Sequence, residues 1–142
     1  MRILFYSGWL TPELCQEHSD KLFVFGDNLK RFGMGGQAVI RNQPNVHGIA
    51  TKRLPSMHEG AFFEEDNLKD LNAVLEDIEE LWDHLKETKV SVVIPVTSAG
   101  QISLGLERAE LQQRAPSIYK TIEMHINEMA NVYGGSDTLE RL

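Results

Sequence analysis

The feature that most constrains the fold is a run of β-branched and apolar residues at 90–96. It reads Val-Ser-Val-Val-Ile-Pro-Val, with almost no alternation between apolar and polar residues. Such a run is typical of a strand that is buried on both faces, as in parallel sheets covered by helices on both sides. Because parallel strands need long crossover connections, the rest of the chain should supply helices between strands. The run therefore predicts an α/β protein with this strand at its centre.

The rest of the chain alternates between strand-like and helix-like segments. Branched and aromatic residues predict strands in three other segments: 1–6, 21–25 and 46–52. Capping residues, prolines and apolar periodicity predict helices in five segments: 11–18, 37–42, 66–86, 107–114 and 117–132. Strands that alternate with helices favour a sheet with helices on both faces. We therefore expect a three-layer α/β/α fold with a mixed, mostly parallel central sheet.

The long helix at 66–86 carries one apolar stripe at helical spacing, and we expect that stripe to face the core. It consists of Leu68, Leu71, Leu75, Ile78, Trp82 and Leu85. The opposite, acidic face should then be solvated. No repeat or linker divides the chain. We therefore expect one domain over residues 1–133 and a frayed tail over 134–142.

Composition places the chain among globular proteins of a reducing compartment. It has 142 residues, of which 42% are hydrophobic and 25% charged, an ordinary balance for one domain. The longest apolar stretch is too short to span a bilayer, and the first residues have no signal-peptide layout. Cys15 is the only cysteine, which excludes a disulfide framework and a thiolate zinc cluster. These features predict a cytoplasmic protein that does not enter membranes.

Charge is distributed unevenly along the chain. The formal net charge is −7, but residues 59–87 hold eleven acids and two bases, whereas residues 21–53 hold six bases and one acid. A globally acidic chain argues against non-specific binding of duplex DNA, since that binding depends on many phosphate contacts. The basic segment, which contains a glycine-rich turn, can attract a small anion such as a nucleotide. A solvated surface with uneven charge is the alternative.

Two loops contain the residues that suggest binding of a phosphorylated ligand. In the first, the strand-like run ending at Phe25 leads through Gly26 to a glycine-rich turn at 33–36 and then to a predicted helix. Such a turn exposes backbone N–H groups that can hold a phosphate, and glycine lets a diphosphate approach the backbone. The turn matches neither the Walker A loop nor the dinucleotide fingerprint. A tight turn without a ligand is the alternative.

The second loop, residues 97–105, leaves the carboxyl end of the predicted central strand and consists largely of small residues. Ligands of open α/β sheets bind at the carboxyl ends of the strands. If the two loops converge there, they form a cleft with two phosphate-facing walls. We therefore predict one binding cleft between the two loops.

Four segments, in this order, carry a resemblance to a known family. They are Gly33-Met34-Gly35-Gly36-Gln37-Ala38, Gly48-Ile49-Ala50-Thr51-Lys52-Arg53, Ile94-Pro95-Val96 and Leu106-Glu107-Arg108. The sequence resembles macrodomains, the α/β fold that binds ADP-ribose, and especially the compact branch that includes the terminal ADP-ribose protein glycohydrolase. The resemblance covers about residues 21–126. The segment 25–29, Phe-Gly-Asp-Asn-Leu, also resembles a signature of small macrodomain-like proteins of bacteria and their phages.

The resemblance implies a ligand-binding role for each matching position. Asp27 and Asn28 would lie at the mouth of the cleft, with Asn28 against the distal ribose. The glycine turn and the second loop would hold ribose and diphosphate from opposite sides, and Thr51 and Lys52 would stand at the floor or rim. The binding residues implied in this way are Asp27, Asn28, Gly33, Gly35, Gly36, Gln37, Thr51, Lys52, Thr97, Ser98, Ala99, Gly100, Gln101, Ile102 and Gly105. The sequence does not place the wall against which adenine would pack.

The glycohydrolase branch uses a lysine that attacks the ribose and an aspartate that assists, and this chain departs from both. No lysine occurs between Lys30 and Lys52, and the aspartate position is Glu107. The candidate catalytic residues are therefore Glu107, for acid–base chemistry, and Lys52, as the nucleophile. The alternatives are that Glu107 only complements a helix dipole and that Lys52 only contacts phosphate.

Three functions remain open at this point. The first is binding of ADP-ribose or a related NAD-derived nucleotide without turnover, to sequester a nucleotide signal or to recognise ADP-ribosylated targets. The second is an ADP-ribosyl hydrolase that acts on protein, nucleic acid or a free derivative. The third is an interaction domain that kept the fold and lost the pocket. In that reading the interface lies on the loop of Phe62 and Phe63 or on the acidic helix. Apart from these readings, Phe62 and Phe63 are expected to form a lid or an oligomer contact, and Trp9 and Trp82 are expected in or near the core. None of the three functions requires a metal or a cofactor, and all leave the oligomeric state open.

Overall fold

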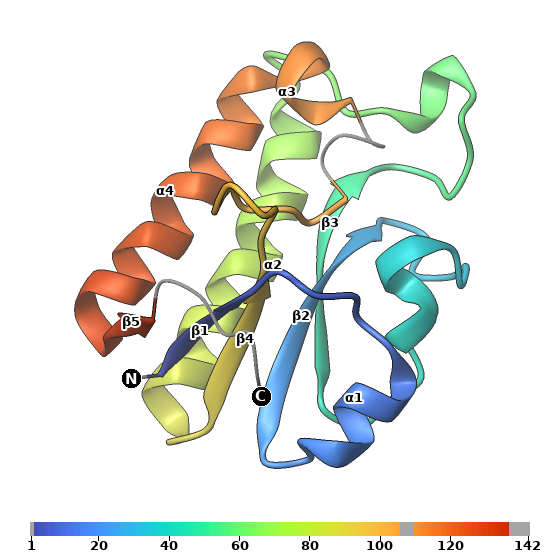
Figure 1. Ribbon diagram of the computed structural model, residues 1–142. Helices are drawn as coiled ribbons and strands as arrows, with labels where there is room; N and C mark the ends of the chain where they lie inside the picture. Colours follow the sequence, from blue (N-terminus) through green and yellow to red (C-terminus); the bar gives the residue numbers. More distant parts are fainter. Residues whose placement is uncertain (1, 106–109, 137–142) are drawn as a thin grey trace.

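The chain folds around a five-stranded sheet in the computed structural model, which describes residues 2–105 and 110–136 (Figure 1). The strands are β1 (Ile3–Tyr6), β2 (Lys21–Asn28), β3 (Val46–Lys52), β4 (Ser91–Pro95) and β5 (Gly135–Ser136). The α-helices are α1 (Pro12–Glu17), α2 (Leu68–Glu87), α3 (Leu111–Arg114) and α4 (Pro116–Tyr133). Two short 3-10 helices are η1 (Gly36–Ile40) and η2 (Glu59–Ala61).

The sheet order is β3-β2-β4-β1-β5, and every pair of neighbouring strands is parallel. Antiparallel pairing within the described residues is confined to two isolated bridges outside the strand pairs. Helix α1 and η1 cover one face of the sheet, whereas α2 and α4 cover the other (Figure 1). The predicted three-layer α/β/α fold is therefore confirmed, and the described strands form a wholly parallel sheet rather than a mixed one.

Strand β4 lies in the middle of the sheet between β2 and β1, as its apolar run predicts. Its side chains alternate between two hydrophobic cores. Val92 and Ile94 pack in the core that includes α2 and α4, and Val93 packs in the core that includes α1 and η1. All three side chains are fully buried. Because both faces of this strand are covered, no alternation of apolar and polar residues was needed in its sequence.

The buried face of α2 differs from the predicted stripe. Leu68 is 71% exposed, and two acids, Asp70 and Asp77, are buried on the inner face instead. Both carboxylates are paired with arginines, Asp70 with Arg53 and Asp77 with Arg31. The prediction of a wholly apolar inner face was wrong because buried charges that are paired can replace apolar side chains. These pairs also attach α2 to the loops at the end of the sheet.

Four other predictions need correction. Trp9 is 88% exposed, whereas Phe62 and Phe63 are buried and do not form a lid. Gly135 and Ser136 are not frayed but form β5, which pairs in parallel with β1. The segment predicted as a helix at 37–42 is the shorter 3-10 helix η1. Of the expected tail, residues 137–142 lie outside the described part of the chain.

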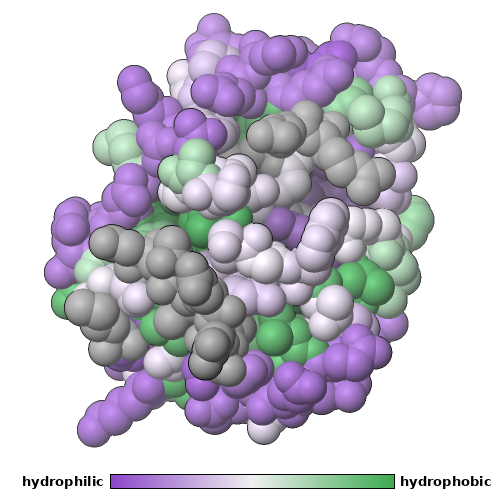
Figure 2. Space-filling model, viewed as in Figure 1, coloured by the Kyte–Doolittle hydropathy of each residue, from purple (hydrophilic) through white to green (hydrophobic). Residues whose placement is uncertain are grey.

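The visible surface mixes polar and apolar groups (Figure 2). Hydrophilic residues dominate the rim of this view, while paler and hydrophobic residues occupy its middle. Within the described residues, no helix is long and apolar enough to cross a bilayer.

Candidate functional site

The predicted glycine-rich turn lines a cavity at the carboxyl ends of β2 and β3. The cavity has a volume of ≈ 300 Å³, at the lower end of the range for small-molecule sites. Its lining residues are Gly26, Asp27, Asn28, Phe32, Gly33, Met34, Gly35, Gly36, Gln37, Ala38, Thr51, Lys52, Pro55, Leu104 and Gly105. We call it the glycine-loop cavity. Nine of the predicted binding residues meet here, namely Asp27, Asn28, Gly33, Gly35, Gly36, Gln37, Thr51, Lys52 and Gly105.

The topology explains why a cavity forms at this place. The chain leaves β2 toward the face that carries η1, and it leaves the neighbouring β3 toward the face that carries α2 (Figure 1). Two adjacent parallel strands whose connections depart to opposite faces leave a crevice between those connections. The glycine-loop cavity occupies such a crevice.

The floor of the cavity depends on a close approach of two backbones. The segment after β4 crosses over β2, and a Cβ added at Gly26 would overlap the carbonyl oxygen of Leu104. Gln37 fixes this crossing with both ends of its amide group. Its Oε1 accepts a hydrogen bond from Gly26 N at 2.9 Å, and its Nε2 donates one to the carbonyl oxygen of Ser103. Gly26 and Gln37 therefore join the two predicted loops, but they do so through Leu104 rather than through the small residues 98–100.

A β-bulge in β3 directs residues toward the cavity. The register pairs Asp27 with Ala50 but Asn28 with Lys52, so Thr51 is the extra residue. Bulges are common next to functional sites because they redirect side chains. At the bulge, the Ala50 N–H donates a hydrogen bond to Asp77 Oδ2 at 2.8 Å. The Thr51 hydroxyl is buried and donates to the carbonyl oxygen of Asp27 at 3.3 Å.

Two buried carboxylates, Asp27 and Asp77, form a network with two arginines beside the cavity. Arg31 Nη2 lies 2.7 Å from Asp77 Oδ1, and Arg31 Nη1 lies 3.3 Å from Asp27 Oδ2. Arg41 Nη2 lies 2.6 Å from the other carboxylate oxygen of Asp27. Partial burial lowers the pKa of Arg31, but the hydrogen bonds that Arg31 donates to Asp77 and Asp27, and the charges of these carboxylates, outweigh burial, so that the pKa is raised overall. Arg31 has a left-handed backbone with φ of 57°, a costly conformation that these ion pairs stabilise.

The loop at residues 29–33, between β2 and the glycine turn, is held by hydrogen bonds from Asn28, which lines the cavity, and from Arg41. Asn28 Nδ2 donates to the carbonyl oxygen of Phe32 at 2.9 Å, and Asn28 Oδ1 accepts from Lys30 N at 3.0 Å. Arg41 Nε donates to the carbonyl oxygen of Gly33 at 3.0 Å. Asn28 therefore has a structural role in shaping the mouth of the cavity, in addition to any contact with a ligand.

The glycine turn presents backbone donors to the cavity. Among the described residues, none accepts a hydrogen bond from the backbone N–H groups of Met34, Gly35, Gly36 and Gln37. A Cβ added at Gly35 would meet no atom within 4 Å, so space beside that backbone is open. Backbone N–H groups that no protein group engages are available to an anion in the cavity that these residues line.

One side of the cavity is apolar, and sequence reasoning did not place it. Phe32 and Met34 flank Gly33 in the turn and are 59% and 49% exposed, respectively. Pro55 lies close to the same turn, because a Cβ added at Gly33 would come within 3.3 Å of its Cβ. The sequence signal that could have identified this wall is the pair of large apolar residues on either side of Gly33, because such residues are unusual in an exposed turn.

Lys52 lines the cavity, and its ammonium group is held by apolar neighbours. Lys52 Nζ lies 5.2 Å from the centre of the Phe62 ring and 3.8 Å from Met57 Sδ. The guanidinium group of Arg114 also contacts Phe62, at 4.2 Å from the ring centre. Both contacts are cation–π interactions, so buried Phe62 positions Lys52 at the rim.

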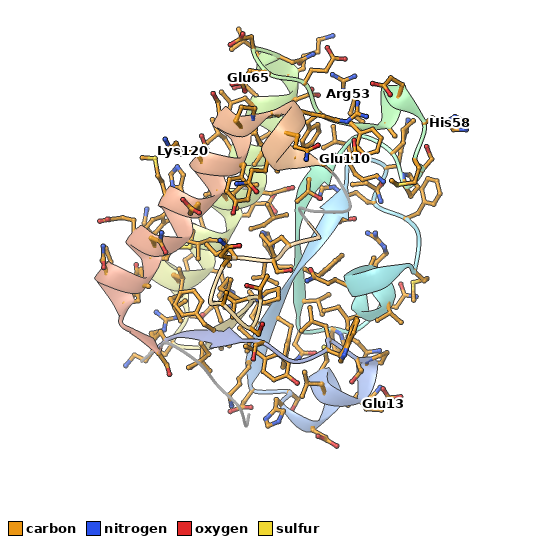
Figure 3. All side chains as sticks on the ribbon, turned by 45° about the horizontal axis from the view of Figure 1, so that its top comes forward. Glu13, Arg53, His58, Glu65, Glu110 and Lys120 are labelled. Carbon is orange, nitrogen blue, oxygen red and sulfur yellow. The ribbon has the colours of Figure 1, made fainter. Side chains whose placement is uncertain are left out.

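The loop between β3 and α2 contributes Pro55 and is anchored at both ends. Arg53 Nη2 lies 2.6 Å from Asp70 Oδ2, and the hydrogen bond from Arg53 to Asp70 raises the pKa of Arg53. Glu65 accepts a hydrogen bond of 3.1 Å from the first turn of α4. Figure 3 shows Arg53 and Glu65 on the body of the molecule, whereas His58 points away from it.

The remaining predicted residues do not line the glycine-loop cavity. Thr97, Gln101 and Ile102 line a separate cavity that faces α3 and α4. The three residues 98–100 are exposed at the tip of a turn that hydrogen bonds between Thr97 and Gln101 close. Glu107, the candidate acid–base residue, lies outside the described residues. The two loops therefore meet, but not as the two phosphate-facing walls that we predicted.

In the described part of the chain, no group of three or more His, Cys, Asp or Glu side chains is placed to hold a metal ion. A family model matches residues 5–125 of the chain. The chain belongs to DUF7831, a family of unknown function. No curated protein and no solved structure matches the chain. The match to DUF7831 includes all residues that line the glycine-loop cavity.

Proposed function

We propose that this protein binds ADP-ribose or a related NAD-derived nucleotide in the glycine-loop cavity. The observation that carries the proposal is the combination of features in that one cavity. Exposed backbone N–H groups of a glycine turn lie beside an apolar wall and a lysine at the rim. A nucleotide diphosphate needs these three features, because it has an anionic centre and an aromatic base.

Each part of the ligand has a matching surface. The base stacks against Phe32 and the neighbouring apolar groups Met34 and Pro55. The diphosphate lies over the N–H groups of Gly35 and Gly36, where a Cβ would occupy the space that the phosphates need. The ammonium group of Lys52 adds a positive charge at the rim.

We propose binding without turnover. Asp27 is the only carboxylate among the described lining residues, and its oxygens are already engaged by Arg31, Arg41 and the backbone N–H of Asn28. A carboxylate held in this way is a poor general base. Lys52 lies over Phe62, and we assign it to the anionic part of the ligand rather than to nucleophilic attack. Cys15, a buried free thiol, is compatible with the reducing cytoplasm as the location.

The test is calorimetric titration of ADP-ribose into the purified protein, with AMP and inorganic pyrophosphate as partial ligands. We expect ADP-ribose to bind more tightly than either partial ligand. Phe32→Ala should weaken binding by roughly tenfold, because stacking of a base on an aromatic ring contributes about 1–3 kcal/mol. Trp9→Ala is the matched control, since Trp9 is an exposed aromatic residue that does not line the cavity.

Two results would count against the proposal. Absence of heat with all three ligands, from protein verified as folded, would favour an interaction domain. Equal loss of affinity in Phe32→Ala and Trp9→Ala would place the ligand elsewhere. Analysis of the ADP-ribose after prolonged incubation separates binding from hydrolysis, and we expect the ligand to remain intact.

A further inference from the structure

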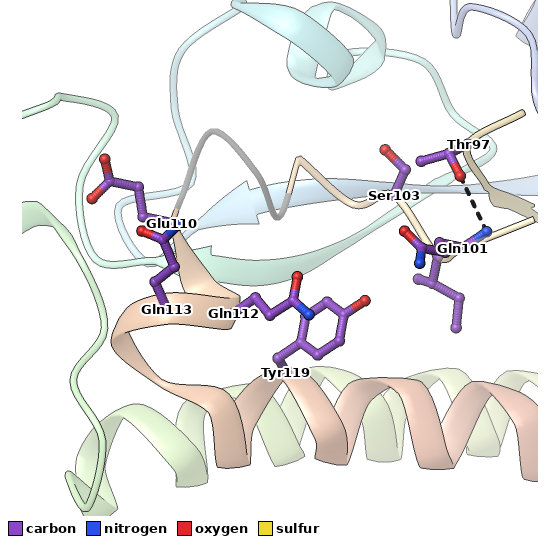
Figure 4. Close-up of a pocket in the computed structure, with 8 residues that line it drawn as sticks. Thr97, Gln101, Ser103, Glu110, Gln112, Gln113 and Tyr119 are labelled. Atoms are coloured by element: carbon purple, nitrogen blue, oxygen red, sulfur yellow. Dashed lines mark hydrogen bonds between the residues drawn. The ribbon is translucent and has the colours of Figure 1, made fainter. Parts of the chain in front are cut away.

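A second cavity lies between the loop after β4 and the helices α3 and α4 (Figure 4). Its volume is ≈ 270 Å³. Its lining residues are Thr97, Gln101, Ile102, Ser103, Glu110, Gln112, Gln113 and Tyr119. We call it the glutamine cavity. The segment that crosses β2 separates it from the glycine-loop cavity, because Ile102 and Ser103 line one and Leu104 and Gly105 line the other.

We propose that the glutamine cavity is a second binding site, which takes a neutral, hydroxyl-rich ligand of the sugar class. Its lining combines three primary amides, three hydroxyl groups and one aromatic ring. Amides and hydroxyls can both donate and accept hydrogen bonds, as the hydroxyl groups of a sugar do. The aromatic ring offers a flat apolar surface for the C–H face of a sugar ring.

The polar groups are arranged on opposite sides of the space. In Figure 4 the side chain of Gln112 lies beside the ring of Tyr119, and both face the loop that carries Gln101 and Ser103. The turn of that loop is closed by its own short hydrogen bonds, from Thr97 N to Gln101 O at 2.7 Å and from Gln101 N to Thr97 Oγ1 at 3.2 Å. The side-chain amide of Gln101 is therefore not needed to hold the turn.

Within the described residues, the side-chain amides of Gln101, Gln112 and Gln113 have no hydrogen-bond partner. A ligand that supplies both donors and acceptors can satisfy them without a change of protein conformation. This contrasts with Gln37 at the neighbouring cavity, whose amide is used at both ends to join two backbone segments.

Charge argues for a neutral ligand rather than an anion. None of the described lining residues is a lysine or an arginine. Glu110 is the one carboxylate among them, and its Oε2 already accepts a hydrogen bond from Arg114 Nε. An anion would gain no partner of opposite charge from these residues, whereas a sugar needs none. The two cavities therefore differ in the class of ligand that they suit.

A neighbouring hollow suggests the length of the ligand. Gln101, Gln112 and Tyr119 also line a more open depression along α4, together with one residue of each charge, Lys120 and Glu123. These three side chains thus stand between two adjoining spaces. A ligand of two sugar rings can contact them from both sides, so a disaccharide should bind more tightly than a single ring.

The test is titration of the full chain, labelled with ¹⁵N, with D-glucose, D-galactose, D-ribose and maltose, followed by NMR. We expect saturable shifts that are confined to residues 97–103 and 110–120, with maltose binding more tightly than glucose. Gln112→Ala should weaken maltose binding by roughly tenfold, the effect of losing one or two well-placed hydrogen bonds. Gln16→Ala is the matched control, because Gln16 is an exposed glutamine on α1, across the sheet, and we expect it to bind as the wild type does.

Three results would overturn the proposal. One is the absence of saturable shifts with every sugar at millimolar concentration. Another is equal maltose affinity in Gln112→Ala and Gln16→Ala. The third is inorganic phosphate producing the same shifts more strongly than maltose. Gln112 is exposed, so its replacement should leave the fold intact. If the amide spectrum of Gln112→Ala shows otherwise, Gln101→Ala takes its place with the same expected loss.

Discussion

Arg31 Nη2 lies 2.7 Å from Asp77 Oδ1 and thereby joins the loop of the glycine-loop cavity to the middle of α2. The same carboxylate accepts a hydrogen bond from Ala50 N at the β-bulge in β3. One buried acid on the helix thus fixes two walls of the cavity. A charge in this position is costly unless it is paired, and the pairing explains why an acidic residue occupies the inner face of α2.

Replacement of Asp77 should destabilise the protein and distort the cavity. Asp77→Ala leaves the Ala50 N–H without its acceptor and leaves the Arg31 guanidinium group with Asp27 as its remaining carboxylate partner. We expect a loss of about 2 kcal/mol in the free energy of unfolding, measured with urea, because the Ala50 N–H loses its acceptor and the partly exposed Arg31 loses one of its two carboxylate partners. Asp83→Ala is the control, since Asp83 lies exposed on the same helix, and it should change stability by less than about 0.5 kcal/mol. Equal effects of the two substitutions would show that Asp77 has no special structural role.

The crossing at Gly26 predicts a steric effect. Gly26→Ala would place a methyl group on the carbonyl oxygen of Leu104, so the segment after β4 must move away from β2. Forced repacking of this kind costs roughly 1–3 kcal/mol, which should appear as a lower urea midpoint. Gly60→Ala introduces the same group where no atom lies within 4 Å. A Gly26→Ala protein as stable as Gly60→Ala would contradict the close approach.

Burial of Cys15 predicts a dependence of stability on pH. Burial raises the pKa of its thiol from 9.0 to about 11, so the folded protein favours the neutral form. Below pH 9.0 the thiol is protonated in both states and its contribution to stability is fully present. Between pH 9.0 and about 11 the unfolded chain ionises first, so the free energy of unfolding falls as pH rises. In Cys15→Ala the free energy of unfolding, measured with urea at several pH values, should fall less between pH 9.0 and about 11 than in the wild type. Identical pH profiles for the variant and the wild type would contradict the raised pKa.

Sequence patterns predicted the strands, helices and turns whose formation depends on residues close together in the chain. The apolar run of β4 identified the central strand, and periodicity located α2 to within two residues. The glycine turn was also predicted from its residues, whereas the Thr51-Lys52 pair was placed by the resemblance to macrodomains; both line the cavity. Each of these features depends on residues that are neighbours in the chain.

The parts that were missed depend on residues that are distant in the chain. The paired acids of α2 looked like a solvated face because their arginines, Arg31 and Arg53, lie in other segments. Phe62 looked like an exposed loop residue, but cations from β3 and α3 cover it. The loop after β4 reaches the cavity with Leu104 rather than with its small residues, because of the crossing over Gly26.

The most direct measurement is a comparison of ADP-ribose binding by Gly35→Ala and Gly60→Ala, by calorimetry. Both substitutions add a methyl group where the protein has no atom within 4 Å, so both proteins should remain as stable as the wild type. Only Gly35 lines the glycine-loop cavity. We predict that Gly35→Ala loses at least about tenfold in affinity, since its Cβ occupies space that the diphosphate needs, and that Gly60→Ala binds like the wild type. Equal affinity of the two variants would contradict nucleotide binding at the glycine turn.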